Sequence, residues 1–198
     1  DEISPTNFGC IFESTVAKDV RDSGGMHYTT PANIHKVIGP LFLNDLTSEL
    51  EVILQLPTET QQQRAIQYSK LEAYRKKLAS LRFLDPACGS GNFLTETYKL
   101  LHELELKAIV QEFKSNYYTR TDVNDPCGVS INQFFGIEID HFAASVARAS
   151  LWIATCQLLQ ETENVLHCSL PTLPLEKNNN ILCDDALSAD WNKLVKRR

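Results

Sequence analysis

The chain has 198 residues, of which 43% are hydrophobic and 22% charged, so it can form one folded domain with a core. Its formal net charge of −6 has the wrong sign for a compact nucleic-acid-binding module, whose usual footprint is a basic face. No basic-plus-apolar leader opens the sequence, and no stretch approaches the roughly 20 apolar residues of a membrane span. The six cysteines include no C-x-x-C pair, which favours reduced thiols in the cytoplasm over a zinc site or disulfides.

Residues 1–80 carry only helical patterns and are interpreted as a helical N-terminal segment. Thr30 is suited to an N-cap and Pro31 to the first helical position, where a missing N–H does no harm. Pro40 should end or kink the helix that starts there. The other helices predicted in this segment cover residues 9–23, 46–56 and 59–80.

Strands and helices alternate after residue 81. The predicted elements are strand 82–84, helix 92–114, loop 115–132, strand 133–140, helix 140–160, loop 169–180, strand 180–187 and the start of a helix over 188–198. This alternation is typical of a parallel, doubly wound sheet flanked by helices. Residues 81–198 are therefore interpreted as an α/β domain.

Each of the three predicted strands ends in a loop that bears an acid. Asp85 follows the first strand and precedes two glycines, Glu138 ends the second, and Asp184 and Asp185 end the third. Ligands of such sheets bind beyond the carboxyl ends of the strands, and glycines there let the backbone approach a ligand closely. An acid after the second strand suits ribose hydroxyls, and one after the third can accept from an adenine amino group.

The glycine loop narrows the choice of adenosine ligand. It reads C-G-S-G-N instead of G-x-G-x-x-G, and Glu138 lies far beyond the 20 or so residues of a dinucleotide fingerprint. No G-K-[ST] is present to cradle a triphosphate. A carboxylate before the glycines would repel a pyrophosphate but suits a cationic ammonium group, as in S-adenosyl-methionine.

Four motifs resemble those of the gamma-class amino-methyltransferases that modify adenine N6 in DNA. "DPACGSGNFL" resembles motif I, and "HYTTP", about 50 residues upstream, resembles the motif that packs on the methionine end of the cofactor. "FFGIEIDHFAASVARASLWIA" and "ILCDDAL" resemble the second and third motifs. The helical lead-in is most similar to the MmeI-like group of type IIG and IIL restriction-modification enzymes. The resemblance implies a Rossmann-like class I S-adenosyl-methionine-dependent methyltransferase fold.

The resemblance also implies roles for thirteen residues. The methionine moiety would be bordered by Tyr28, Thr29, Thr30 and Pro31, and its amino and carboxylate groups would be held by Asp85, Ala87, Gly89 and Gly91. Glu138 would bind the ribose hydroxyls, and Phe93 and Ile139 would pack against the cofactor. Asp185 would accept from the adenine amino group, with Ala186 beside it. Asp185 is preferred to Asp184 because it takes the acidic position of the pattern G-[DN]-A-L.

The family's catalytic motif, [DNS]-P-P-[YF], has no counterpart here, since the eight prolines are never adjacent. The chain is therefore expected to be the cofactor-binding portion of a longer enzyme, with no catalytic residue of its own and no metal. Its partner would be DNA, contacted largely by other parts of that enzyme, and no membrane partner is expected.

Two alternatives remain at the level of sequence. Some methyltransferases that act on RNA guanine carry a similar D-P-x-C-G-S-G loop, although "HYTTP" argues against them. A non-catalytic nucleotide-binding module, or a dehydrogenase-like domain, would be distinguished by its choice of cofactor.

Overall fold

The computed structural model describes residues 29–114, 127–170 and 180–195. Their helices are α3 (Pro31–Ile38), α4 (Asn44–Leu54), α5 (Gln61–Ser80), α6 (Asn92–Lys114), α7 (His141–Leu166) and α8 (Trp191–Val195). A π-helical turn η1 (Gly39–Leu43) and a 3-10 turn η2 (Ile131–Gln133) complete the helical elements. The strands are β1 (Phe83–Asp85), β2 (Phe134–Glu138) and β3 (Ile181–Cys183). The predicted helix over 9–23 lies outside the described residues.

The three strands form a parallel sheet in the order β1-β2-β3. Phe83 pairs with Phe134, Gly136 with Ile181, and Glu138 with Cys183. The connections from β1 to β2 and from β2 to β3 both move across the sheet in the same direction. The described strands therefore show one of the two winding directions of a doubly wound sheet. The coarse expectation of a parallel α/β sheet is confirmed, whereas the second winding direction stays a prediction.

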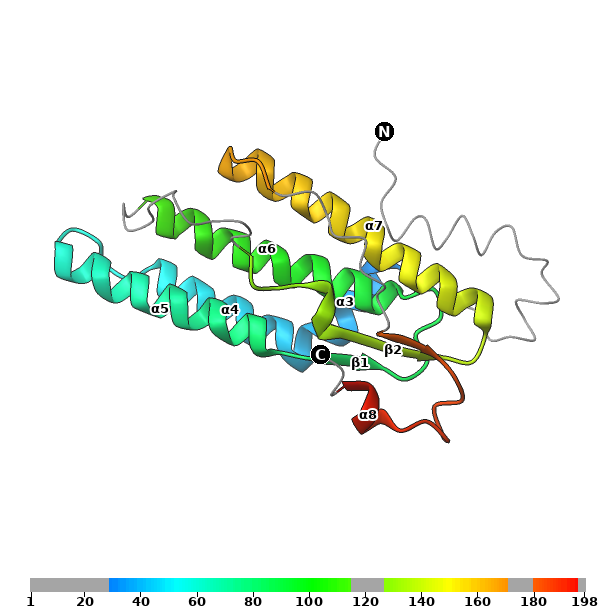
Figure 1. The fold of residues 1–198 in the computed structure, drawn as a ribbon. Helices are drawn as coiled ribbons and strands as arrows, with labels where there is room; N and C mark the ends of the chain where they lie inside the picture. Colours follow the sequence, from blue (N-terminus) through cyan, green and yellow to red (C-terminus); the bar gives the residue numbers. More distant parts are fainter. Residues whose placement is uncertain (1–28, 115–126, 171–179, 196–198) are drawn as a thin grey trace.

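Two cores lie on opposite faces of the sheet because successive residues of β2 point to opposite sides. Phe134 belongs to the larger core, which α4 to α7 cover on one face (Figure 1). Phe135 and Ile137 belong to a smaller core closed by Leu194 of α8 on the other face. The larger core joins α5 and β2, so residues on both sides of position 80 share it. The domain boundary at residue 80 stays a prediction.

Helix α5 begins and ends where its sequence predicts. Thr60 accepts a hydrogen bond from the backbone N–H of Gln63, whose side chain accepts in return from the N–H of Thr60, which makes a capping box. Tyr74 is 1% exposed, and its hydroxyl donates to the carbonyl oxygen of Leu46 at 3.0 Å. This bond fixes α5 against α4.

Helix α7 differs from its prediction in two respects. It runs to Leu166 instead of residue 160, because Leu158 and Thr162 continue its buried face, while Trp152 on the same helix is 41% exposed. By length and composition α7 could also cross a membrane, contrary to the expectation for this chain, although half of its most apolar window is buried inside the structure. Packing against α6 and the sheet accounts for that apolar character.

Candidate functional site: the carboxyl edge of the sheet

The glycine loop leaves β1 and turns into α6 within a few residues. The backbone N–H of Cys88 donates to the carbonyl oxygen of Ile137 at 3.0 Å, and that of Gly91 to Cys88 at 2.8 Å. Gly89 and Gly91 have φ angles of +53° and +83°, in the region that side chains disfavour. The two glycines therefore make the sharp turn, while the bond from Cys88 fixes the loop to β2.

The three glycines near this loop serve different contacts. A Cβ on Gly91 would lie 3.1 Å from the Cβ of Ala147, so Gly91 lets the loop pack against α7. A Cβ on Gly136 would lie 2.7 Å from the Sγ of Cys88, so Gly136 leaves room for the loop beside β2. A Cβ on Gly89 would meet nothing within 4 Å. The backbone at Gly89 thus borders open space that a ligand can occupy.

Glu138 connects the glycine loop to the start of α7. Its Oε2 accepts from the N–H of Gly89 at 2.8 Å, and its Oε1 accepts from the N–H of Asp140 at 2.9 Å. The carboxylate is therefore held at the loop, at the place where the sequence predicts ribose contacts.

Asp85 lies on the same edge and is partly buried. Burial raises the pKa of its carboxyl, and the nearby Glu138 carboxylate raises it further, although a hydrogen bond from the N–H of Ala87 at 3.1 Å opposes the shift. A second negative charge at this edge is thus unfavourable without a cation. An ammonium group beside Asp85 would relieve that cost.

The turn after β3 brings the third acid to the edge. The N–H of Asp184 donates to the carbonyl oxygen of Glu138 at 3.1 Å, so the ends of β2 and β3 are joined. Asp185 is exposed, and its Oδ1 accepts from the N–H of Leu187 at 2.9 Å. Ala186 is half-buried in the smaller core.

Apolar side chains border the same edge. Ile139 follows β2 and is 72% exposed, which is unusual for an isoleucine beside a core strand. Phe93, in the first turn of α6, is half-buried. Both side chains can offer apolar surface to a planar ligand.

Three of the four predicted methionine-end residues are described. Tyr28 lies outside the described residues, whereas Thr29, Thr30 and Pro31 lead into α3, which packs against α6. Thr30 is the N-cap by its backbone alone, since its side chain makes no capping bond. His35 of α3 contacts Glu96 in the first turns of α6, with 2.8 Å between Nε2 and Oε1. This contact holds α3 alongside the helix that follows the glycine loop.

The structure therefore joins Gly89, Glu138 and Asp184 through direct hydrogen bonds, while α3 is attached to α6 through His35 and Glu96. Sequence reasoning missed Gly136 and Trp191 as parts of this framework. Gly136 carried a usable signal, because a glycine inside a strand often marks a close backbone approach.

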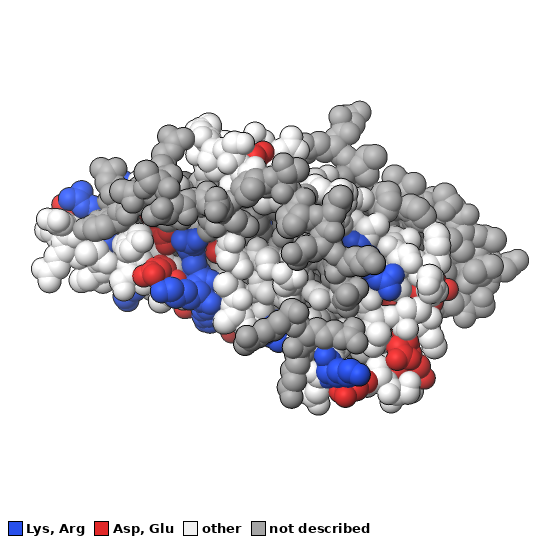
Figure 2. Space-filling model, viewed as in Figure 1, with Lys and Arg blue, Asp and Glu red and all other residues white. Residues whose placement is uncertain are grey.

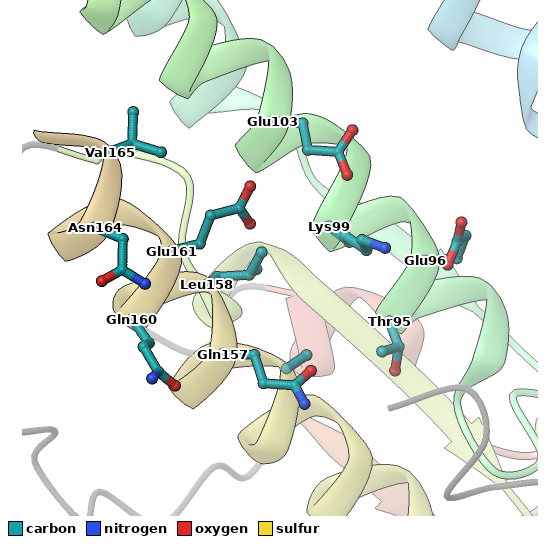
Figure 3. Close-up of a pocket in the computed structure, with 11 residues that line it drawn as sticks. Thr95, Glu96, Lys99, Glu103, Gln157, Leu158, Gln160, Glu161, Asn164 and Val165 are labelled. Carbon is teal, nitrogen blue, oxygen red and sulfur yellow. The ribbon is translucent and has the colours of Figure 1, made fainter. Parts of the chain in front are cut away.

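A cavity of about 500 Å³ lies elsewhere, between α6 and α7 (Figure 3). Lys99 and Glu103 line it from α6, and Gln157 and Glu161 from α7. None of the predicted cofactor residues lines it. Among the described residues, no cluster of three or more His, Cys, Asp or Glu side chains could hold a metal.

A parallel sheet with a glycine loop after β1 and acids at all three strand ends defines a methyltransferase-like α/β domain. Residues 58–198 match the model of the MmeI DNA-methyltransferase domain family, and the chain belongs to that family. The MmeI-like resemblance found in the sequence is thereby confirmed.

Similar proteins agree with this assignment. DNA methyltransferase A of Bacillus subtilis (strain 168) is 37% identical over 98% of the chain, which covers 20% of that protein. The adenine-specific methyltransferase BrxX of Escherichia coli O9:H4 (strain HS) is 44% identical over 34% of the chain and 5% of its own length. The solved structure of the type IIL restriction-modification enzyme MmeI in complex with DNA matches with a TM-score of 0.83 at 36% identity, covering 98% of this chain and 24% of that one. The chain thus spans a quarter or less of these relatives.

Proposed function

We propose that the chain is the S-adenosyl-methionine-binding part of a DNA methyltransferase that modifies adenine N6 in a restriction-modification system. The observation that carries the proposal is the convergence of Asp85, Glu138 and Asp185 on one sheet edge, around a loop whose Gly89 borders open space. The relatives that are DNA methyltransferases support this reading over an RNA guanine methyltransferase.

The residues at the edge fit the chemical groups of this cofactor. Asp85, whose carboxyl is partly buried and has a raised pKa, suits an ammonium group. The carboxylate of Glu138, which accepts from the Gly89 N–H, would accept from the ribose hydroxyls in place of this bond or in addition to it. Ile139 and Phe93 would pack on the cofactor, and Asp185 would accept from the adenine amino group. Tyr28, Thr29, Thr30, Pro31, Ala87, Gly91 and Ala186 would complete the pocket.

The methyl transfer itself would need groups outside this chain. S-adenosyl-methionine supplies an activated methyl group as a sulfonium. A [DNS]-P-P-[YF] loop, which accepts hydrogen bonds from the target amino group, would come from a further part of a longer protein. The target adenine must also leave the duplex to reach the pocket. This chain alone is accordingly expected not to methylate DNA.

The DNA contacts would also come largely from other regions. The net charge is −6. On the face in Figure 2, the Lys and Arg side chains of the described residues are interspersed with Asp and Glu, and they form no extended basic area there. A surface of this kind supplies few phosphate contacts.

Calorimetric titration of the chain with S-adenosyl-methionine, and separately with NAD, tests the cofactor assignment. Binding of the first ligand alone is expected. Glu138→Gln should weaken it about 10- to 100-fold, because hydrogen bonds to a charged group contribute about 1.5–3 kcal/mol. Glu163→Gln is the matched control, since Glu163 also accepts from a backbone N–H, that of Leu170 at 2.8 Å, but lies at the far end of α7. Binding of NAD, or an unchanged affinity in Glu138→Gln, would contradict the proposal.

The target base is tested in the longer protein. DNA, and separately RNA, is incubated with it and with S-adenosyl-methionine carrying a labelled methyl group, and each is digested to nucleosides. The label should appear in N6-methyl-2′-deoxyadenosine from the DNA. Label in a methylated cytosine, or in RNA guanine and not DNA, would refute the adenine assignment while leaving the cofactor site intact.

A further inference from the structure

Hydrogen bonds close the turn that carries Asp185. The carbonyl oxygen of Asp185 accepts from the N–H groups of Ser188 and Ala189 at 3.0 and 2.9 Å. Ala186 and Ala189 pack against the smaller core, whereas the side chain of Leu187, at the tip, is 96% exposed. The position of the Asp185 carboxylate therefore depends on the bonds that close this turn together with these two small side chains.

One of these bonds comes from the side chain of Trp191. Its indole Nε1–H donates to the carbonyl oxygen of Ala186 at 2.7 Å, five residues back along the chain. The indole is 43% exposed, so its ring is not buried in a core. An exposed tryptophan with its polar atom engaged on a backbone carbonyl is suited to fixing a loop rather than to filling space.

Helix α8, which carries Trp191, is itself fixed to the sheet. Leu194, three residues later in α8, is 2% exposed and packs with Phe135 and Ile137 of β2 in the smaller core. Asp190 precedes the helix, and its Oδ1 accepts from the N–H of Lys193 at 3.0 Å. The indole thus reaches the turn from a helix that is attached to the underside of the sheet (Figure 1).

The bond also affects the carboxylate of Asp185. Its Oδ1 accepts from the N–H of Leu187, and among the described residues its Oδ2 accepts from no donor. The carbonyl that Trp191 holds and the N–H of Leu187 belong to the same planar peptide unit, the one between Ala186 and Leu187, so holding the carbonyl fixes the N–H that orients the carboxylate. One carboxylate oxygen then stays available at the sheet edge.

We propose that Trp191 is a positioning residue for recognition of the adenine amino group. It acts through Ala186 on Asp185 and does not itself touch the cofactor. This role rests on the proposed function, since it concerns the adenine end of the same site.

Two nucleosides that differ at one position test the role. S-adenosyl-homocysteine carries the amino group, whereas S-inosyl-homocysteine carries a carbonyl in its place. The wild-type chain should bind the first more tightly. Trp191→Phe, which keeps a ring but loses the N–H donor, should narrow the ratio of the two dissociation constants about three- to tenfold, the range of one neutral hydrogen bond. The affinity for the inosine compound should change little.

Trp152→Phe is the matched control, because Trp152 is similarly exposed, at 41%, but lies on α7. It should leave both affinities unchanged. A double-variant cycle adds a second test. Asp185→Asn should remove the preference for the amino group by itself, and adding Trp191→Phe should then have no further effect on the ratio.

The outcomes separate the proposals. An equal loss of affinity for both nucleosides in Trp191→Phe, or an unchanged ratio, would overturn the positioning role while leaving the cofactor assignment standing. Independent, additive effects of the two substitutions on the ratio would also overturn it. A wild-type chain that binds neither nucleoside would overturn the proposed function, and the role of Trp191 with it.

Discussion

Gly136 of β2 is where the sheet and the glycine loop come closest. A Cβ at this position would lie 2.7 Å from the Sγ of Cys88, 3.1 Å from its Cβ and 2.8 Å from the Cδ1 of Ile181. Two contacts below 3.0 Å force both neighbours to move, and overpacking of this kind costs about 1–3 kcal/mol. This cost is partly offset, because alanine loses less backbone entropy on folding than glycine, a difference of about 0.5–1 kcal/mol in a strand. Because both neighbours must move, the upper half of the overpacking range applies, about 2–3 kcal/mol, and Gly136→Ala should lower the free energy of unfolding by about 1–2.5 kcal/mol.

Urea unfolding of the chain measures this loss, and the midpoint of thermal unfolding should fall by about 2–8 °C. Cys88→Ala removes the Sγ, so the double variant should be more stable than the sum of the two single changes predicts, by at least about 0.5 kcal/mol. If Gly136→Ala is neutral, or if the two changes are additive, the loop does not rest on β2 as described. The same variant should weaken cofactor binding, because the displaced loop carries the N–H of Gly89.

Three further substitutions probe the surroundings of the site. Gly89→Ala should cost about 1–2 kcal/mol of stability because of the positive φ at this position, and it should abolish cofactor binding. Gly91→Ala should destabilise the chain more, because its new Cβ would also lie against Ala147 of α7. Equal midpoints of unfolding for the two variants would refute this difference. Burial raises the pKa of Asp85 in the folded chain, so the stability that its protonated carboxyl contributes is present below the ordinary pKa of 3.8 and is lost as pH rises through the higher folded pKa. Asp85→Asn should therefore stabilise the cofactor-free chain at neutral pH yet weaken cofactor binding. A pH series of urea unfolding that shows no gain in stability for this variant contradicts the reasoning. Glu105→Ala should cost about 2–4 kcal/mol in urea unfolding, since its buried carboxylate accepts from two backbone N–H groups, and Glu103→Ala, for which the described part of the chain shows no such bond, should cost much less.

The strands and the glycine loop were predictable because their signals are local. An apolar run that stops at Asp85 before two glycines already specifies a strand, a turn and a helix start. The predicted helix over 92–114 matches α6 at both ends. The third strand was overestimated, since β3 ends at Cys183 and the acids after it form a turn. Alternation of residue types does not distinguish a strand from a turn that closes on itself.

Pro40 shows both the use and the limit of local reasoning. The α-helix α3 ends at Ile38, as expected from Pro40, but Pro40 itself lies in the π-helical turn η1, which leads directly into α4. Proline lacks an N–H, so a widened turn accommodates the missing bond. The buried residues Ile38 and Leu46, on either side, show that packing keeps the two helices together.

The contacts that make the site are long-range and could not be read from spacing. Gly89 and Glu138 are 49 positions apart, and His35 and Glu96 are 61 apart. The motifs predict which residues form the site, but only the fold shows that Glu138 accepts a hydrogen bond from the loop backbone. The same holds for Trp191, whose partner Ala186 becomes evident only once the turn is closed.

The helical segment also contributes to the geometry of the site, through a chain of buried polar contacts. Arg75 of α5 lies 3.5 Å from Glu105 of α6, whose carboxylate accepts from the N–H groups of Gly128 and Val129 at 2.8 Å. Gln133, at the entry to β2, donates to the carbonyl oxygens of α5 and its C-cap, both at 2.8 Å. These bonds fix where β2 begins, and a strand of five residues transmits that position to its end at Glu138. Glu138 is therefore placed by the helices before the sheet as well as by the sheet itself. Substitutions at Glu105 should accordingly reduce cofactor affinity as well as stability.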